Sequence, residues 1–160
     1  NVQVVCVNGN HGEFRAKGSS EKANGDDLVY DTLEIYSDKL GMDNIKFVKS
    51  DRTDKVIFNF KGHRGLLTHG DNRSFHVGTS SPQSDWLSFK DQYRFDAAFR
   101  GHYHDFRIER VNEAPVVMTP SHKPGSNFED KLGTYGDPKN VVYFATEENP
   151  VSDIKVFDVE

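Results

Sequence analysis

The order of apolar and polar residues along the chain predicts alternating strands and helices. Residues 2–7 form a short apolar run, typical of a strand that is covered on both faces of its sheet. Residues 24–27 offer helix-starting side chains, and apolar residues at approximately helical spacing follow as far as Gly41, so a helix is expected near 27–40. Three short strands arranged as a meander are then expected at 45–48, 55–61 and 65–69.

The second half of the chain shows the same mixture. After a polar loop, Ser84 or Asp85 is expected to cap a helix that runs through Trp86 and Tyr93. Because strands and helices alternate and no repeat or linker interrupts them, we expect one layered α/β or α+β domain that spans residues 1–160. The further strands are expected near 96–99, 106–112, 115–119, 141–146 and 152–159.

The amino-acid composition argues against some classes of protein. The 160 residues include 20 basic and 25 acidic side chains, and a net charge of −5 argues against whole-chain electrostatic binding to nucleic acid or to an anionic membrane. No apolar run approaches the roughly 20 residues that span a bilayer. The single cysteine, Cys6, cannot form an internal disulfide and no signal-peptide pattern opens the chain, so a cytoplasmic location is expected.

Three polar segments follow predicted strands directly. They are Gly-Asn-His-Gly-Glu at 9–13, Thr-His-Gly-Asp at 68–71 and Gly-His-Tyr-His at 101–104. Strand ends in layered α/β folds converge on one edge, so histidines far apart in sequence can meet there. Neutral imidazole and amide oxygen suit Mn²⁺, Fe²⁺ or Zn²⁺, whereas one cysteine excludes a thiolate site. The sequence therefore predicts a metal site.

The same three segments carry a family resemblance. Gly9-Asn10-His11, His69-Gly70 and Gly101-His102-Tyr103-His104 resemble, in order, the last three motifs of the calcineurin-like metallophosphoesterases. The segment Pro124-Gly125-Ser126 is similar to the Gly-Ser turn of that family. The resemblance implies a four-layer β-sandwich flanked by helices. Within the family, the chain looks similar to phage and prophage enzymes that are grouped with DNA-repair exonucleases.

The resemblance implies two divalent ions, with manganese expected and iron, zinc or nickel as alternatives. Asn10, His69 and His102 would bind one ion, and His104 would bind the second. His11 would act as the catalytic residue, stabilising charge on the phosphoryl oxygens or protonating the leaving group. Two neighbouring ions clamp a phosphate and lower the pKa of a bridging water.

Further residues are expected around this centre. The carboxylates of Asp71 and Asp105 would orient the imidazoles. Glu13 stands one place later than the acidic residue of the family motif, because Gly12 intervenes. Tyr103 would either stack on a base or simply pack. The candidate substrate-binding residues are Arg100, Tyr103, His76 and His122.

One departure from the family concerns the first half of its site. An Asp-x-His motif and a Gly-Asp-x-x-Asp motif should precede Gly9, but only eight residues do. We therefore expect a C-terminal portion of the domain with its N-terminal part missing, and the second metal site reduced to His104. An exposed apolar face or unpaired strand edge is expected where the missing half belongs, with homo-oligomers as one consequence.

These observations leave three hypotheses about function. The first is metal-dependent hydrolysis of a phosphoester, expected to be a phosphodiester such as a nucleic acid, by a two-metal centre of which this chain carries part. The second is an inactive fragment or binding module that uses its loops for protein contacts. The third is one half of a split enzyme, whose partner chain bears the Asp-x-His and Gly-Asp-x-x-Asp motifs.

Overall fold

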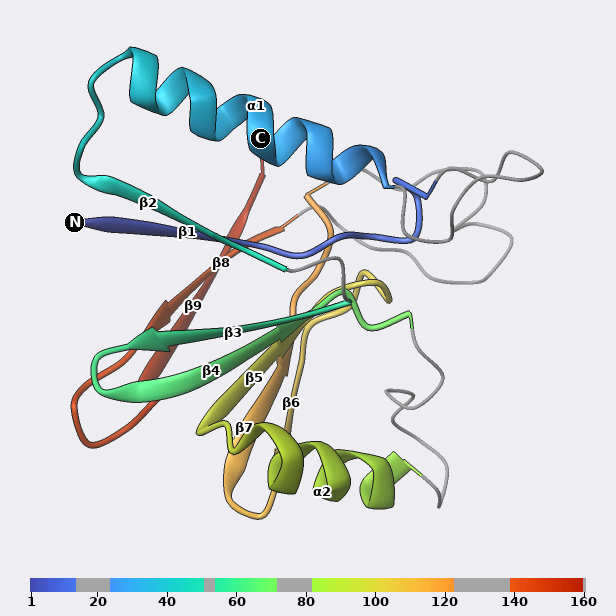
Figure 1. Cartoon of the computed structure of the whole chain (residues 1–160). Helices are drawn as coiled ribbons and strands as arrows, with labels where there is room; N and C mark the ends of the chain where they lie inside the picture. Colours follow the sequence, from blue (N-terminus) through green and yellow to red (C-terminus); the bar gives the residue numbers. More distant parts are fainter. Residues whose placement is uncertain (14–23, 51–53, 72–81, 123–138, 160) are drawn as a thin grey trace.

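The computed structural model describes residues 1–13, 24–50, 54–71, 82–122 and 139–159. Figure 1 shows helices α1 and α2 on opposite outer sides, with the strands between them. None of the helices in these ranges is long and apolar enough to cross a membrane. In chain order the elements are β1 (Val2–Cys6), α1 (Gly25–Lys39), β2 (Ile45–Lys49), β3 (Lys55–Phe60), β4 (His63–Thr68), α2 (Pro82–Tyr93), β5 (Ala97–Arg100), β6 (Arg107–Val111), β7 (Ala114–Met118), β8 (Lys139–Phe144) and β9 (Asp153–Asp158).

The first three elements form a βαβ unit. β1 and β2 pair in parallel, from Val2 opposite Ile45 to Cys6 opposite Lys49. α1 is present as predicted and begins at Gly25, two residues earlier than expected, because the Asn24 side chain accepts a hydrogen bond from a backbone N–H of the first turn. The predicted meander is wrong at its first step, since β2 pairs with β1 and not with β3. A helical crossover returns the chain to the starting end of β1, which makes the next strand parallel to it.

A five-stranded sheet has the order β3-β4-β5-β7-β6. The inner strands β4, β5 and β7 are parallel, and the edge strands β3 and β6 are antiparallel to their neighbours. α2 covers one face. The helix starts at Pro82, before the Ser84 or Asp85 that was predicted to cap it, because proline is well suited to the first turn of a helix. The core on this face contains Leu66, Trp86, Phe95, Ala98, Val111, Ala114 and Val116.

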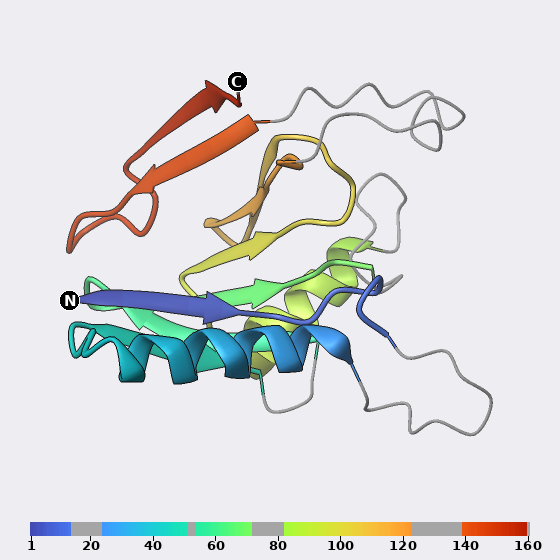
Figure 2. The ribbon, with the colours of Figure 1, turned by 90° about the horizontal axis from the view of Figure 1, so that it is seen from above.

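Aromatic rings fill the other face of this sheet. The rings of Phe58 and Phe99 lie 6.1 Å apart, and Phe99 lies 5.2 Å from Tyr143 of the β8–β9 hairpin. A Cβ at Gly65 would lie 2.4 Å from Phe58, so only glycine leaves room for that ring. Figure 2 shows the hairpin on the side of the sheet away from α2.

α1 turns a polar side toward the sheet. The Tyr30 hydroxyl donates to the Val7 carbonyl at 2.9 Å, and Lys49 of β2 forms ion pairs with Asp31 and Glu34. Its apolar side chains, expected on a helical stripe, point into solvent. They are 50 to 70% exposed and comprise Leu28, Val29, Leu33, Ile35, Tyr36 and Leu40.

β1 departs from the sequence-based expectation. Its first residues are exposed, Val2 at 50%, so it is not a strand covered on both faces. Within the described residues, β1 pairs with β2 alone, and no strand is hydrogen-bonded to its other edge. The expected exposed apolar face and unpaired strand edge are thus both present in the βαβ unit.

A matched pair of leucine substitutions tests the location of the core. Leu66 is fully buried and Leu28 is 70% exposed. Leu66→Ala should lower the free energy of unfolding by about 2–5 kcal/mol, through lost burial and a residual cavity. Leu28→Ala should change it by less than about 0.5 kcal/mol. Urea unfolding of both variants would check this, and equal losses would contradict the assigned core.

Candidate metal centre

Three side chains with metal-binding atoms meet at one edge of the strands. Asn10 follows β1, His69 follows β4 directly, and His102 follows β5. β4 and β5 are parallel neighbours, so the residues after them start from the same edge. The Gly101 N–H donates to the His69 carbonyl at 3.1 Å, which joins the two histidine loops. The structure therefore brings together the three residues predicted for the first ion.

The distances from His69 to the other two donor atoms fit one metal ion. Nε2 of His69 lies 2.9 Å from Oδ1 of Asn10 and 3.2 Å from Nδ1 of His102. Atoms bound to a common ion by bonds of about 2.1 Å lie roughly 3 Å apart. Two imidazole nitrogens and an amide oxygen also form a chemically suitable set for a borderline divalent ion.

Burial keeps both imidazoles ready for metal binding. Desolvation lowers the pKa of His69, although the charge of Asp71 acts in the opposite direction. The pKa of His102 is lowered first by desolvation and then by the neighbouring His69. Because a lowered pKa favours the neutral imidazole at neutral pH, little free energy is needed to remove a proton before a metal binds.

The backbone turns sharply in both histidine loops. His102 and His104 have positive φ angles of 73° and 55°, and Gly70 has φ 94°. Left-handed backbone is uncommon for residues other than glycine, although histidine adopts it more readily than most. The loop therefore does not continue as an extended strand. A Cβ at Gly70 would make only ordinary contacts with Arg100 and the Gly101 carbonyl at 3.4 Å, so the positive φ is what favours glycine at that position.

The remaining predicted site residues lie around this group. His11 is exposed directly after Asn10. The charges of His11 and His104 both lower the pKa of His69 and of His102, which places the two side chains within electrostatic reach. Among the described residues, no three His, Cys, Asp or Glu side chains form a group that could hold an ion, so Asn10 is needed as the third donor.

The predicted carboxylates differ in their surroundings. Asp71 acts electrostatically on both His69 and His102, as an orienting carboxylate would. Asp105 instead forms an ion pair with Arg107 at 2.8 Å. Glu13 is exposed and forms a β-bridge with Asn24 at the start of α1.

The predicted substrate residues are also dispersed. Arg100 is only 3% exposed, and its guanidinium lies 5.5 Å from the ring centre of Tyr103. Tyr103 in turn packs edge-on against His102 at 4.9 Å. His122 is exposed, and His76 lies outside the described residues.

Sequence reasoning missed the residues that hold the Asn10 loop. Asn24, Asp26 and Asp27 were recognised only as helix-starting residues, yet all three bond to residues 8 and 9. The only signal in the sequence is their acidic and amide character, which helix capping explains equally well. Their second role depends on a contact between segments about 15–20 residues apart.

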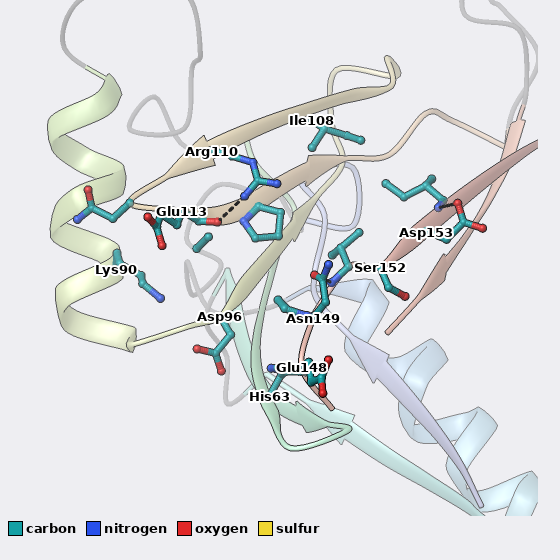
Figure 3. Close-up of a pocket in the computed structure, with 16 residues that line it drawn as sticks. His63, Lys90, Asp96, Ile108, Arg110, Glu113, Glu148, Asn149, Ser152 and Asp153 are labelled. Atoms are coloured by element: carbon teal, nitrogen blue, oxygen red, sulfur yellow. Dashed lines mark hydrogen bonds between the residues drawn. The ribbon is translucent and has the colours of Figure 1, made fainter. Parts of the chain in front are cut away.

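A cavity of about 670 Å³ lies at the other end of the five-stranded sheet. Figure 3 shows it between the β6–β7 hairpin, α2 and the loop before β9, with His63, Lys90, Asp96 and Glu148 among its lining residues. None of the predicted metal, catalytic or substrate residues lines it. The candidate metal centre is therefore an edge-of-sheet site that is separate from this cavity.

Comparison with known proteins supports the fold. No protein-family model and no curated protein sequence matches the chain. A double mutant of Vps29 from Entamoeba histolytica has a similar structure, with 12% identity and a TM-score of 0.54 over 99% of this chain and 82% of that one. A zinc complex of wild-type Vps29 from the same organism has 13% identity and a TM-score of 0.49 over 72% and 68%. A predicted phosphoesterase from Streptococcus pneumoniae has 14% identity and a TM-score of 0.43 over 72% and 71%.

The first of these likenesses shows that the chain has the mixed α/β fold of Vps29 over nearly its whole length. At 12% identity it shows the fold alone. It gives no support to the expected absence of an N-terminal part, since 99% of this chain is aligned.

Metal titration tests the donor group directly. We expect the purified chain to bind Mn²⁺ or Zn²⁺ weakly and at one site, as measured by isothermal titration calorimetry. His69→Ala and His102→Ala should each weaken binding by about tenfold or more, because each removes a ligand. His122→Ala, on an exposed residue, should leave the affinity unchanged. Unchanged binding in all three variants would contradict the assignment, and no binding by the wild-type chain would favour a binding module.

Proposed function

We propose that this chain contributes the Asn10, His69 and His102 side of a metal-dependent phosphoesterase centre. The observation that supports the proposal is the convergence of their donor atoms, 2.9 and 3.2 Å apart, at the edge where parallel strands end. The fold shared with Vps29 is consistent with it. The assignment to the calcineurin-like metallophosphoesterases, the choice of manganese and the likeness to phage exonucleases rest on motif resemblance.

The residues suggest a division of roles. When bound, a divalent ion supplies Lewis-acid stabilisation of phosphate charge and a more acidic water. Asn10, His69 and His102 would hold it through neutral donors. His11, exposed beside Asn10, would donate a proton or hydrogen bond to the departing oxygen. The proposed substrate is a phosphodiester. His104 would be the ligand that this chain contributes to a second ion.

Hydrolysis of bis-p-nitrophenyl phosphate tests how complete the centre is. With Mn²⁺ present, the chain alone should release little or no p-nitrophenol above a metal-only blank, because the described residues hold no group of three His, Cys, Asp or Glu side chains that could bind an ion, and hydrolysis of this kind uses two. The control is His11→Ala, which should give the same background rate. Robust turnover that His11→Ala abolishes would show that the centre is complete in this chain.

A split enzyme is the second candidate, and the outer surface of the βαβ unit favours it. Val29, Leu33, Tyr36 and Leu40 follow a spacing of four, three and four residues, which places them on one stripe of α1. At 100° per residue this stripe lies on the flank opposite Asp31 and Glu34, which bind Lys49 of β2. The stripe therefore overhangs the side where β1 has its free edge.

This surface suits a second polypeptide with a strand and a helix. The strand would pair with the free edge of β1, and the helix would cover the apolar stripe of α1. A strand parallel to β1 would end at the same edge as Asn10. Carboxylates at that end, as in Asp-x-His and Gly-Asp-x-x-Asp motifs, would complete the metal centre.

Complex formation tests the split enzyme. Purification from the source should yield this chain together with a second polypeptide whose sequence, by mass spectrometry, contains both carboxylate motifs. Mixing the two should restore hydrolysis of bis-p-nitrophenyl phosphate. Leu33→Lys should weaken the complex by about tenfold or more, as for an interface hot spot, whereas Leu28→Lys, 140° around α1 from Leu33 at 100° per residue, should not. A strictly monomeric chain, or a dimer of this chain alone through the same stripe, would contradict the idea.

A further inference from the structure

The loop that carries Asn10 lies on the first turn of α1. Its carbonyl at Gly12 accepts a hydrogen bond from the Gly25 N–H at 2.7 Å. On the other side of Asn10, the Asn8 side chain donates to Asp27 Oδ1, also at 2.7 Å. The loop is thus attached to the helix both before and after the metal-binding residue.

The peptide groups of Gly9 are held most tightly. The Gly9 N–H donates to Oδ2 of Asp26 at 2.7 Å, and the Gly9 carbonyl accepts from Nδ2 of Asn24 at 2.9 Å. Hydrogen bonds to a carboxylate are roughly twice as strong as those between neutral groups. Asp26 therefore provides the stronger of the two attachments that fix the residue before Asn10.

Gly9 lies between Asp26 and His69. A Cβ added at Gly9 would be 3.5 Å from Oδ2 of Asp26 and 3.3 Å from Cε1 of His69. The carboxylate and the imidazole are therefore both close neighbours of Gly9, where a side chain would be crowded. A movement of Gly9 by about 1 Å would be enough to spoil the 2.9 Å contact between Asn10 and His69, since donor sites tolerate only about 0.5 Å.

The helix itself does not account for this use of Asp26. Asn24 is the N-cap, and its side chain accepts the Asp26 N–H at 2.9 Å. The carboxylate of Asp26 bonds outside the helix, to a residue 17 positions earlier in the chain. At Gly12, an added Cβ would lie 2.6 Å from Asp26 Oδ1, so the chain is fitted closely around that carboxylate on both sides of Asn10.

We propose that Asp26 is a positioning residue of the metal centre, which holds the Gly9 peptide so that the Asn10 amide oxygen faces His69. Asp26 binds no metal in this role. It acts through the backbone, in the way that outer carboxylates orient metal ligands in other proteins. The inference rests on the proposed function for the identity of the bound group, but the positioning itself is a property of the metal-free chain.

Three substitutions on α1 separate positioning from general effects. Asp26→Ala removes the acceptor, and Asp26→Asn keeps an oxygen that can accept the Gly9 N–H. Asp31→Ala removes the same charge from the same helix, but Asp31 is exposed and pairs with Lys49 away from the loop. Calorimetry with Mn²⁺ should show a loss of about 10- to 100-fold for Asp26→Ala. Asp26→Asn should recover most of the affinity, and Asp31→Ala should bind as the wild-type chain does.

A second readout does not need the metal. In ¹H–¹⁵N spectra of the metal-free chain, Asp26→Ala should move the Gly9 amide upfield, toward the position of an unbonded N–H, and should shift the Asn10 side-chain amide. Asp31→Ala should move neither resonance. Thermal unfolding of each variant would establish that it is folded, and if Asp26→Ala is not, Asp26→Asn takes its place with smaller shifts of the same sign.

The outcomes distinguish this inference from the proposed function. Wild-type Mn²⁺ affinity in Asp26→Ala, or equal losses in Asp26→Ala and Asp31→Ala, would overturn the positioning role. If the wild-type chain binds no metal, the proposed function fails and the spectra alone decide the positioning role. In that case unchanged Asn10 and Gly9 resonances in Asp26→Ala would overturn it, and the stated shifts would support it.

Discussion

The close contact between residues 8–12 and the first turn of α1 is the constraint on which the candidate site depends. Gly12 has no room for a Cβ, which would lie 2.0 Å from Asn24, and a Cβ at Gly9 would lie 3.3 Å from His69 and 3.5 Å from Asp26. Such contacts fix a loop without a regular element, because the Gly9 N–H and the carbonyls of Gly9 and Gly12 find partners at the helix terminus. The first polar loop thereby gains the rigidity that β4 and β5 give directly to His69 and His102.

The same helix explains why the βαβ unit is the least self-sufficient part of the structure. α1 meets the sheet through the Tyr30 hydroxyl and through ion pairs of Lys49, while its apolar stripe faces solvent. Ion pairs at the surface contribute only about 0–1 kcal/mol each. Covering four large apolar side chains would contribute several times more, at about 1.5–3 kcal/mol for each full burial. The order of the site therefore depends on a helix whose largest potential stabilisation, burial of its apolar stripe, is not realised within the described residues.

The sequence predicted the elements well and their partners less well. Short apolar runs and the Asn24 cap locate β1, α1 and most other elements within a few residues. The pairing of β2 with β1 was missed, because a run such as Ile45–Lys49 looks the same in a meander and in a crossover. The convergence of Asn10, His69 and His102 was predictable, since each follows a strand. The role of Asp26 was not, because a capping pattern and a loop contact use the same residues.

The three candidate ligands carry no negative charge to offset that of a bound ion. Asn10, His69 and His102 are neutral donors, so a bound divalent ion would keep its full charge in a partly buried place. Asp71 acts on both imidazoles but forms no three-residue group with them among the described residues. Buried ionic charge is costly unless opposite charges lie close. A set of neutral ligands therefore holds an ion weakly by itself and more strongly when phosphate oxygens or further carboxylates approach. The site as this chain builds it is suited to be completed by an anion from outside.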